Sequence, residues 1–197
     1  ISSSGGTGTK TFTLFSGTLP TGLSISSSTG TISGTPTQVI DRAITVRVAD
    51  TASATATTSS FTLSIGKASQ SITFGSLSNK TMGTGTVSLS ATASSGLTVV
   101  FTSATESVCT VATATVTLVS AGTCTINADQ AGNGNYSAAA QVPQSFTVAA
   151  ALTITTPNSG LSGTYNTSYS LAISSSGGTG TKTFTLFSGT LPTGLSI

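Results

Sequence analysis

Charged side chains are scarce in this sequence, and two residue types are missing altogether. Its 197 residues include six Lys and Arg, four Asp and Glu, no His and no Trp, whereas about a quarter of an ordinary globular protein is charged. Without His, the chain has no Ser-His-Asp triad, no imidazole base and no His-bound metal. We therefore expect no catalytic residues and no bound cofactor.

The few charges that exist are also dispersed. The acids are Asp41, Asp50, Glu106 and Asp129, and a paired-carboxylate site or a calcium cage needs several of them together. We expect no metal site. A net charge of +2 lacks the clustered Lys and Arg of a nucleic-acid interface, so we expect no nucleic-acid partner. No apolar run approaches the length of a transmembrane helix, no signal peptide is visible, and we expect no membrane span in this segment.

Hydroxyl side chains dominate what is present: the sequence contains 42 Thr and 35 Ser. Apolar and hydroxyl residues alternate with the period of two that is typical of half-buried strands, and no window has helical periodicity. The alternation is clearest at residues 43–48, 61–65, 71–74, 86–90 and 115–118. Strands at this spacing, separated by Gly, Ser, Asn and Pro, predict an all-β protein built from small β-sandwiches.

An exact internal repeat sets the domain organisation. Residues 173–197 are identical to residues 1–25, letter for letter. An identity of this length predicts a tandem array with a 172-residue period. Each period divides into two modules, so the chain is expected to hold one complete and two partial modules. Residues 1–67 lack their first strands, 68–150 form the complete module, and 151–197 begin the next, with strands at 152–155 and 169–173.

Two sets of motifs resemble known bacterial repeats. The first comprises residues 19–25 (LPTGLSI), 29–37 (TGTISGTPT), 45–50 (TVRVAD) and 61–65 (FTLSI). Residues 151–172 joined to 1–67 therefore resemble the He_PIG immunoglobulin-like modules of bacterial surface proteins, which are relatives of cadherin-like domains. The motifs at 70–74, 89–97, 108–111, 121–126, 130–133 and 144–148 resemble a second bacterial Ig-like repeat. The resemblance implies tandem immunoglobulin-like β-sandwiches that serve as scaffold.

The two cysteines are the candidate site residues. Cys109 shares a strand face with Val111 and Cys124 with Ile126, so both sulfur atoms are expected on the apolar side. A Cys109–Cys124 disulfide would contribute about 3 kcal/mol and would indicate an oxidising compartment. Two buried free thiols are the alternative. A catalytic thiol would need a basic neighbour.

Other sequence features have ordinary explanations. The sequons at Asn79, Asn135 and Asn166 are expected by chance in a chain this rich in Asn, Ser and Thr. Residues 174–180 (SSSGGTG) could be mistaken for a phosphate loop, but the Lys-Ser/Thr pair and the helix that should follow are missing. This segment is expected to be a hairpin turn.

These observations favour a non-catalytic structural repeat of a long extracellular bacterial fibre, stalk or adhesin. Its partners would be neighbouring copies of the same repeat, within one polypeptide or between polypeptides. One alternative is a discrete filament subunit that polymerises by strand donation, residues 151–172 supplying the strand that 1–67 lack. Another is a carbohydrate-binding module, for which Tyr136, Tyr165 and Tyr169 would be the only large aromatic platforms besides Phe.

Overall fold

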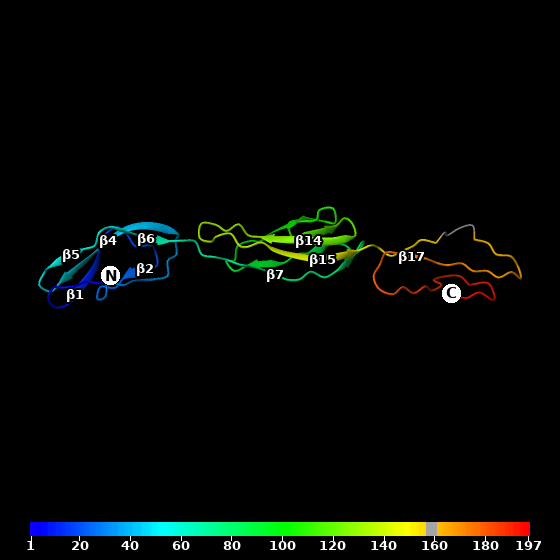
Figure 1. Ribbon diagram of the computed structural model, residues 1–197, viewed down its shortest axis with the longest axis horizontal. Helices are drawn as coiled ribbons and strands as arrows, with labels where there is room; N and C mark the ends of the chain where they lie inside the picture. Colours follow the sequence, from blue (N-terminus) through cyan, green and yellow to red (C-terminus); the bar gives the residue numbers. More distant parts are fainter. Residues whose placement is uncertain (157–160) are drawn as a thin grey trace. The chain divides into compact units, whose positions relative to one another are not determined.

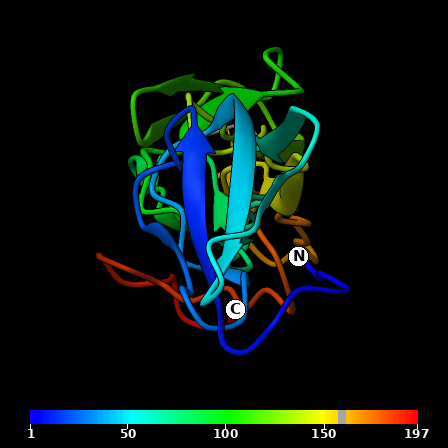
Figure 2. The same ribbon diagram turned by 90° about the vertical axis from the view of Figure 1, so that its left-hand side faces the viewer.

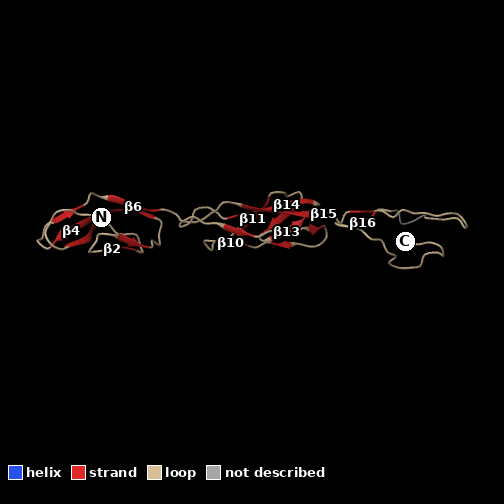
Figure 3. Cartoon of the chain, turned by 60° about the horizontal axis from the view of Figure 1, so that its bottom comes forward, coloured by secondary structure: helices blue, strands red, loops and turns tan. Residues whose placement is uncertain are grey.

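The computed structural model of the chain describes residues 1–156 and 161–197 (Figure 1). Every regular element in these residues is a β-strand, as the red segments of Figure 3 show. The prediction of an all-β fold is confirmed. No helix among the described residues is long and apolar enough to cross a membrane.

The chain divides into two compact units. Unit 1 comprises residues 1–71 together with the short segments 93–97 and 130–140, and unit 2 comprises 72–92, 98–129 and 141–197. The module boundaries expected after residues 67 and 150 stay predictions, although β6 ends at Ile65 and β15 ends at Ala149.

The central strand of unit 1 is β4 (Ile40–Asp50). Its second half pairs antiparallel with β1 (Lys10–Ser16) on one edge and with β5 (Thr55–Thr57) on the other. Figure 2 shows β1 in blue beside β4 in cyan. The first half of β4 pairs with β6 (Phe61–Ile65), while β2 (Leu23–Ile25) and β3 (Ile32–Gly34) form a separate hairpin.

The core of unit 1 follows from alternation along these strands. Phe12 on β1 and Ile44 and Val46 on β4 are buried. Gly30 lies against the Phe12 ring with a φ of 70°, and a Cβ at this position would stand 2.7 Å from Cδ1 of Phe12. A side chain there would therefore be strained and would displace the aromatic ring.

Among the described residues, unit 2 contains two larger sheets and two short strand pairs, one of them beyond residue 150. The first sheet has the order β11 (Val100–Ser103), β14 (Gly122–Asp129), β15 (Val142–Ala149), β8 (Lys80–Thr81), with β8 parallel to β15. The second has the order β12 (Cys109–Ala112), β13 (Thr115–Leu118), β9 (Val87–Ser88), and β7 (Ile72–Phe74) pairs with β10 (Ala91–Ala93).

Strands from both sheets of unit 2 contribute buried side chains to its core. On β14 the alternate residues Cys124, Ile126 and Ala128 are fully buried, as the period of a strand requires. Val116 of the second sheet is equally buried. The rings of Phe74 and Phe101 lie 5.3 Å apart at their centroids, a separation typical of favourable aromatic contacts.

Beyond residue 150 regular structure is sparse. The two strands described there are β16 (Thr153–Ile154) and β17 (Ser175–Ser176), which pair antiparallel. The expected strand at 152–155 is shorter than predicted, and the expected strand at 169–173 is not formed, so that prediction is wrong. Alternation supplies the residue pattern of a strand, but a strand also needs a neighbour to accept its backbone hydrogen bonds.

Candidate functional site

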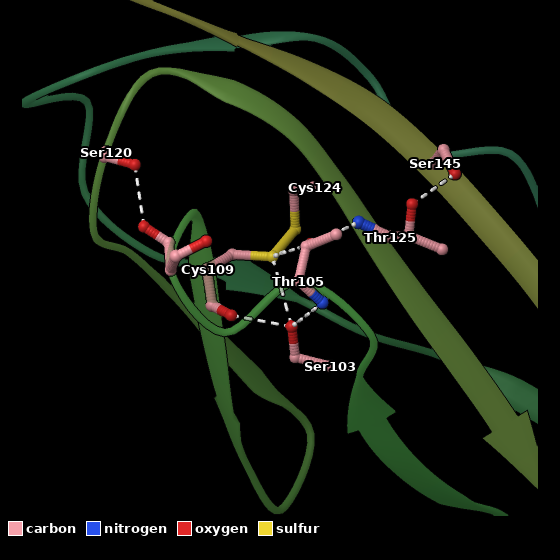
Figure 4. The surroundings of a disulfide bond; sticks show 8 residues. Ser103, Thr105, Cys109, Ser120, Cys124, Thr125 and Ser145 are labelled. Atoms are coloured by element: carbon pink, nitrogen blue, oxygen red, sulfur yellow. Dashed lines mark hydrogen bonds between the residues drawn. A yellow bond between two sulfur atoms is a disulfide. The ribbon is translucent and has the colours of Figure 1, made fainter.

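The structure joins Cys109 and Cys124 through a disulfide between β12 and β14 (Figure 4). The S–S distance is 1.99 Å, and the two Cα atoms are 5.7 Å apart. Because β12 and β14 belong to different sheets, the bond connects the two sheets of unit 2 covalently. Both cysteines are 0% exposed, so the bond is shielded from thiols in solution.

A set of hydroxyl side chains surrounds the bond. Ser103 Oγ donates to the carbonyl oxygen of Cys109 at 2.7 Å and lies 3.5 Å from its Sγ. Thr105 Oγ1 lies 3.6 Å from the same sulfur and accepts the backbone N–H of Thr125 at 3.0 Å. These contacts, drawn in Figure 4, fix the loop before β12 against β14. None of these contacts is made by a cation or a base, which a reactive thiol would need beside it.

Two glutamines of the second motif set, Gln70 and Gln130, hold the segments 93–97 and 130–140 within unit 1. Gln70 Nε2 donates to Gln130 Oε1 at 3.0 Å and to the Ser137 carbonyl at 2.7 Å. Ser95 Oγ donates to Gln70 Oε1 at 2.5 Å. Gln70, Ser95 and Gln130 all belong to the motifs from which the second Ig-like repeat was predicted, and these bonds give the motifs a structural role in fixing loops.

Asp50 closes a loop at the end of β4. Its carboxylate accepts the backbone N–H groups of Thr7 at 2.7 Å, Ala54 at 2.8 Å and Ala52 at 3.0 Å. These bonds, first of all that from Thr7, and the charge of Lys10 lower the pKa of Asp50 below its ordinary value of 3.8. Its oxygens are therefore occupied by the protein's own backbone. Within residues 1–156 and 161–197, no three His, Cys, Asp or Glu side chains come together in a metal-binding group.

The remaining sequence candidates are Asn79 and the three tyrosines. Asn79 Oδ1 accepts the backbone N–H of Thr147 at 2.8 Å, so its amide helps to anchor β15. Tyr136 forms a bridge with Ala68, whereas Tyr165 is almost fully exposed. Tyr169 lines a cleft together with the apolar side chains of Leu171 and Phe184.

The serines of the repeated segment take part in a pairing that the sequence did not reveal. In the second copy of the repeat, Ser175 and Ser176 are not a hairpin turn but the strand β17, paired with β16. Thr153 Oγ1 and Ser176 Oγ are 2.8 Å apart, and Thr155 Oγ1 and Ser174 Oγ are 2.9 Å apart. The hydroxyl-rich sequence hid this pairing because alternation is not visible in a run of three serines.

The same serines in the first copy, Ser2, Ser3 and Ser4, have no partner strand in the part of the chain that the structure describes. They border a cleft with a volume of about 250 Å³ on the surface of unit 1. Its other walls are the apolar side chains of Ile1, Phe12, Val46, Val48 and Ala56 and two threonines.

Comparison with known protein families gives a match to the first part of the chain. Residues 1–66 match the He_PIG family model, described as "Putative Ig domain". The predicted resemblance of residues 1–67 to He_PIG is thereby confirmed. The family model covers a third of the chain, and the assignments of 68–150 and of 151–172 to Ig-like repeats stay predictions.

Solved structures give broader similarities. They include Drosophila N-cadherin EC1-4 (12% identity, TM-score 0.32, 71% of this chain and 41% of that chain) and human CDH23 EC21-23 (13%, 0.34, 72% and 59%). The S-layer protein SbsC domains 4 and 5 match at 18% identity and a TM-score of 0.28, over 71% of this chain and 70% of that chain.

These alignments are too loose to carry an argument about mechanism or partners. The chain spans less than two thirds of the length of the cadherin fragments named above. No curated protein matches the sequence.

Proposed function

We propose that this chain is a non-catalytic structural repeat of a long extracellular fibre, stalk or adhesin, in which Ig-like sandwiches follow one another with a 172-residue period. The observation that carries the proposal is the identity of residues 173–197 to residues 1–25. Two identical copies within one chain are the signature of a tandem array. The partners of each repeat are its neighbouring copies.

The conformation of the repeated segment supports this reading. Gly5 and Gly177 both have a φ of 70°, and Gly22 and Gly194 both have a φ of 91°. Leu23 N donates to Pro20 O at 3.1 Å, and Leu195 N donates to Pro192 O at the same distance. The tight turns of the module are therefore encoded locally and recur with the sequence.

The disulfide supports an extracellular location. Disulfides persist in oxidising compartments and are rare in the cytosol. The surface is equally suited to a structural role outside the cell, because Thr and Ser cover strand faces and keep them hydrated with few charges. Short connections such as residues 66–68 leave little free linker, which favours a stiff array.

The decisive experiment is the mass of the native polypeptide, denatured and with its disulfides reduced. A tandem array predicts a very large polypeptide that limited proteolysis cuts into a ladder. The spacing of the ladder should be roughly 17 kDa, in proportion to the 19.2 kDa of the 197 residues. A single species near 19.2 kDa would refute the array and favour the discrete subunit that polymerises by strand donation.

A further inference from the structure

The two copies of the repeated segment differ in what lies beside their serines. In the second copy β16 runs antiparallel to β17, with Thr153 opposite Ser176 and Ile154 opposite Ser175. Thr155 N also donates to the Ser174 carbonyl at 3.0 Å, and Ser174 N donates to Thr156 Oγ1 at 2.7 Å. At the equivalent place in the first copy lies the cleft bordered by Ser2, Ser3 and Ser4.

A glycine in the turn that follows gives a second, independent indication. Gly177 is passed so closely by residue 151 that a Cβ at this position would overlap the carbonyl oxygen of Ala151. Gly5 is the identical residue in the first copy, with the same φ of 70°, but no atom lies within 4 Å of its Cβ position. The turn thus has the same shape in both copies, and in the first copy the space for a passing backbone is open.

Unit 1 offers an apolar surface that matches the residues such a strand would bring. Thr153 and Thr155 face the hydroxyls of β17 and its neighbour, so Leu152 and Ile154 point to the opposite face of the strand. Both are largely exposed in the second copy. In the first copy the buried Phe12 and Val46 lie at the bottom of the cleft, and its accessible apolar side chains are Ile1, Val48 and Ala56. Leu152 and Ile154 could cover these three side chains.

We infer that the cleft of unit 1 binds residues 152–156 of a second copy of this repeat as an added antiparallel strand. Thr153 lies opposite Ser4, Ile154 opposite Ser3 and Thr155 opposite Ser2, which is the register of β16 and β17 transferred to the identical serines of the first copy. Leu152 and Ile154 fill the cleft, and the hydroxyl pairs face outward. This inference rests on the proposed function in that another copy of the repeat supplies the strand.

Disulfide trapping in the full 197-residue chain tests the register. The probe is a capped peptide of residues 150–156 in which Thr153 or Thr155 is replaced by Cys, and the protein carries Ser4→Cys or Ser2→Cys. The Cys109–Cys124 bond is fully buried and should not exchange. The matched pairs, Ser4→Cys with Thr153→Cys and Ser2→Cys with Thr155→Cys, should cross-link at least 10-fold faster than the two exchanged pairs.

Two variants check what holds the strand. Ile154→Asp in the peptide should abolish the preference for matched pairs, because a charge would enter the apolar cleft. Gly5→Ala in the protein should reduce trapping of the matched pairs, because the added methyl group would meet the passing backbone. Alanine at a positive φ strains the backbone whether or not the peptide is bound. The melting temperature of the Gly5→Ala variant without peptide therefore measures this strain separately from its effect on trapping.

Equal trapping rates for matched and exchanged pairs would overturn the inference, as would a matched preference that survives Ile154→Asp. The outcome is independent of the length of the native polypeptide. A discrete native species near 19.2 kDa together with matched trapping would refute the array and leave the strand-binding cleft. A proteolytic ladder without matched trapping would support the array and refute the cleft.

Discussion

The sequence of residues 1–25 occurs again at 173–197, and the two copies adopt different secondary structure. In the first copy, Lys10–Ser16 forms β1 and Leu23–Ile25 forms β2, but residues 182–188 and 195–197 of the second copy are not strands. Phe12 is 6% exposed and its counterpart Phe184 is 38% exposed. The tight turns, by contrast, are the same in both copies.

The difference teaches which part of this structure is local and which depends on neighbours. β1 is a strand because it pairs with β4, and Phe12 is buried in unit 1, as are Ile44 and Val46 of β4. Residues 151–197 contain no segment equivalent to β4. Conversely, among the described residues the serines pair in the second copy alone, where residues 153–155 precede them. Each copy lacks the neighbour that the other one has.

The largest change should come from supplying the second copy with its missing neighbour. A chain extended after Ile197 by a further copy of residues 26–67 should turn 182–188 into a strand paired with the new counterpart of β4. Hydrogen exchange at the Thr185 amide, the counterpart of Thr13 opposite Arg47 of β4, should then slow by at least about 100-fold. The control carries Asp at the new positions that correspond to Ile44 and Val46. Unchanged exchange in the extended chain would mean that β1 does not owe its structure to β4.

A matched pair of substitutions should separate the two copies next. Phe12→Ala should lower the free energy of unfolding of unit 1 by about 3–5 kcal/mol, because it empties a buried site. Phe184→Ala, in an identical local sequence, should change stability by less than about 1 kcal/mol. Hydrogen exchange of the β4 amides measures the first effect. Equal losses for the two variants would show that the second copy is packed as tightly as the first.

Removing the disulfide should affect neither copy directly. Replacing both Cys109 and Cys124 by Ala should destabilise the sheets of unit 2 by about 3 kcal/mol, because the loop that the bond closes gains freedom in the unfolded state. Exchange at Ile126 should accelerate accordingly, while exchange at Val46 should be unchanged. Reduction of the wild-type chain under denaturing conditions, followed by refolding, serves as the comparison. Faster exchange at Val46 would show that the two units are coupled.

The smallest expected effect is a loss of amide protection in acid, and it should be confined to the first copy. Backbone N–H groups lower the pKa of Asp50, so its contribution is fully present above the ordinary value of 3.8 and is lost as the pH falls through the lowered value. Protection of the Thr7 amide, which donates to Asp50, should disappear in acid. Thr179, its counterpart, should show no such step, and Asp50→Asn should remove it from Thr7. A step at Thr179 would assign the effect to the turn itself.

The alternation of apolar and hydroxyl residues predicted the strands that have a pairing strand within this sequence. Residues 61–65 and 115–118 were expected from the sequence, and β6 and β13 have these bounds. The same pattern at 169–173 predicted a strand that is not formed. Alternation indicates which face of a strand is buried, but it does not show whether another strand is present to pair with it. The contact of Asp50 with Thr7 and the cleft beside Ser2–Ser4 bring together segments that are distant in the sequence, which composition and spacing cannot locate.

The position of the disulfide has a consequence for the length of the chain under tension. The bond joins cysteines separated by 15 residues in the sequence, on β12 and β14, so a pull on the two ends of unit 2 cannot straighten the stretch between them. An extended residue spans about 3.4 Å, and about 50 Å of contour is therefore withheld for as long as the bond is intact. In a row of such units, each bond would set a fixed limit to extension, and reducing it would release the same increment from every repeat.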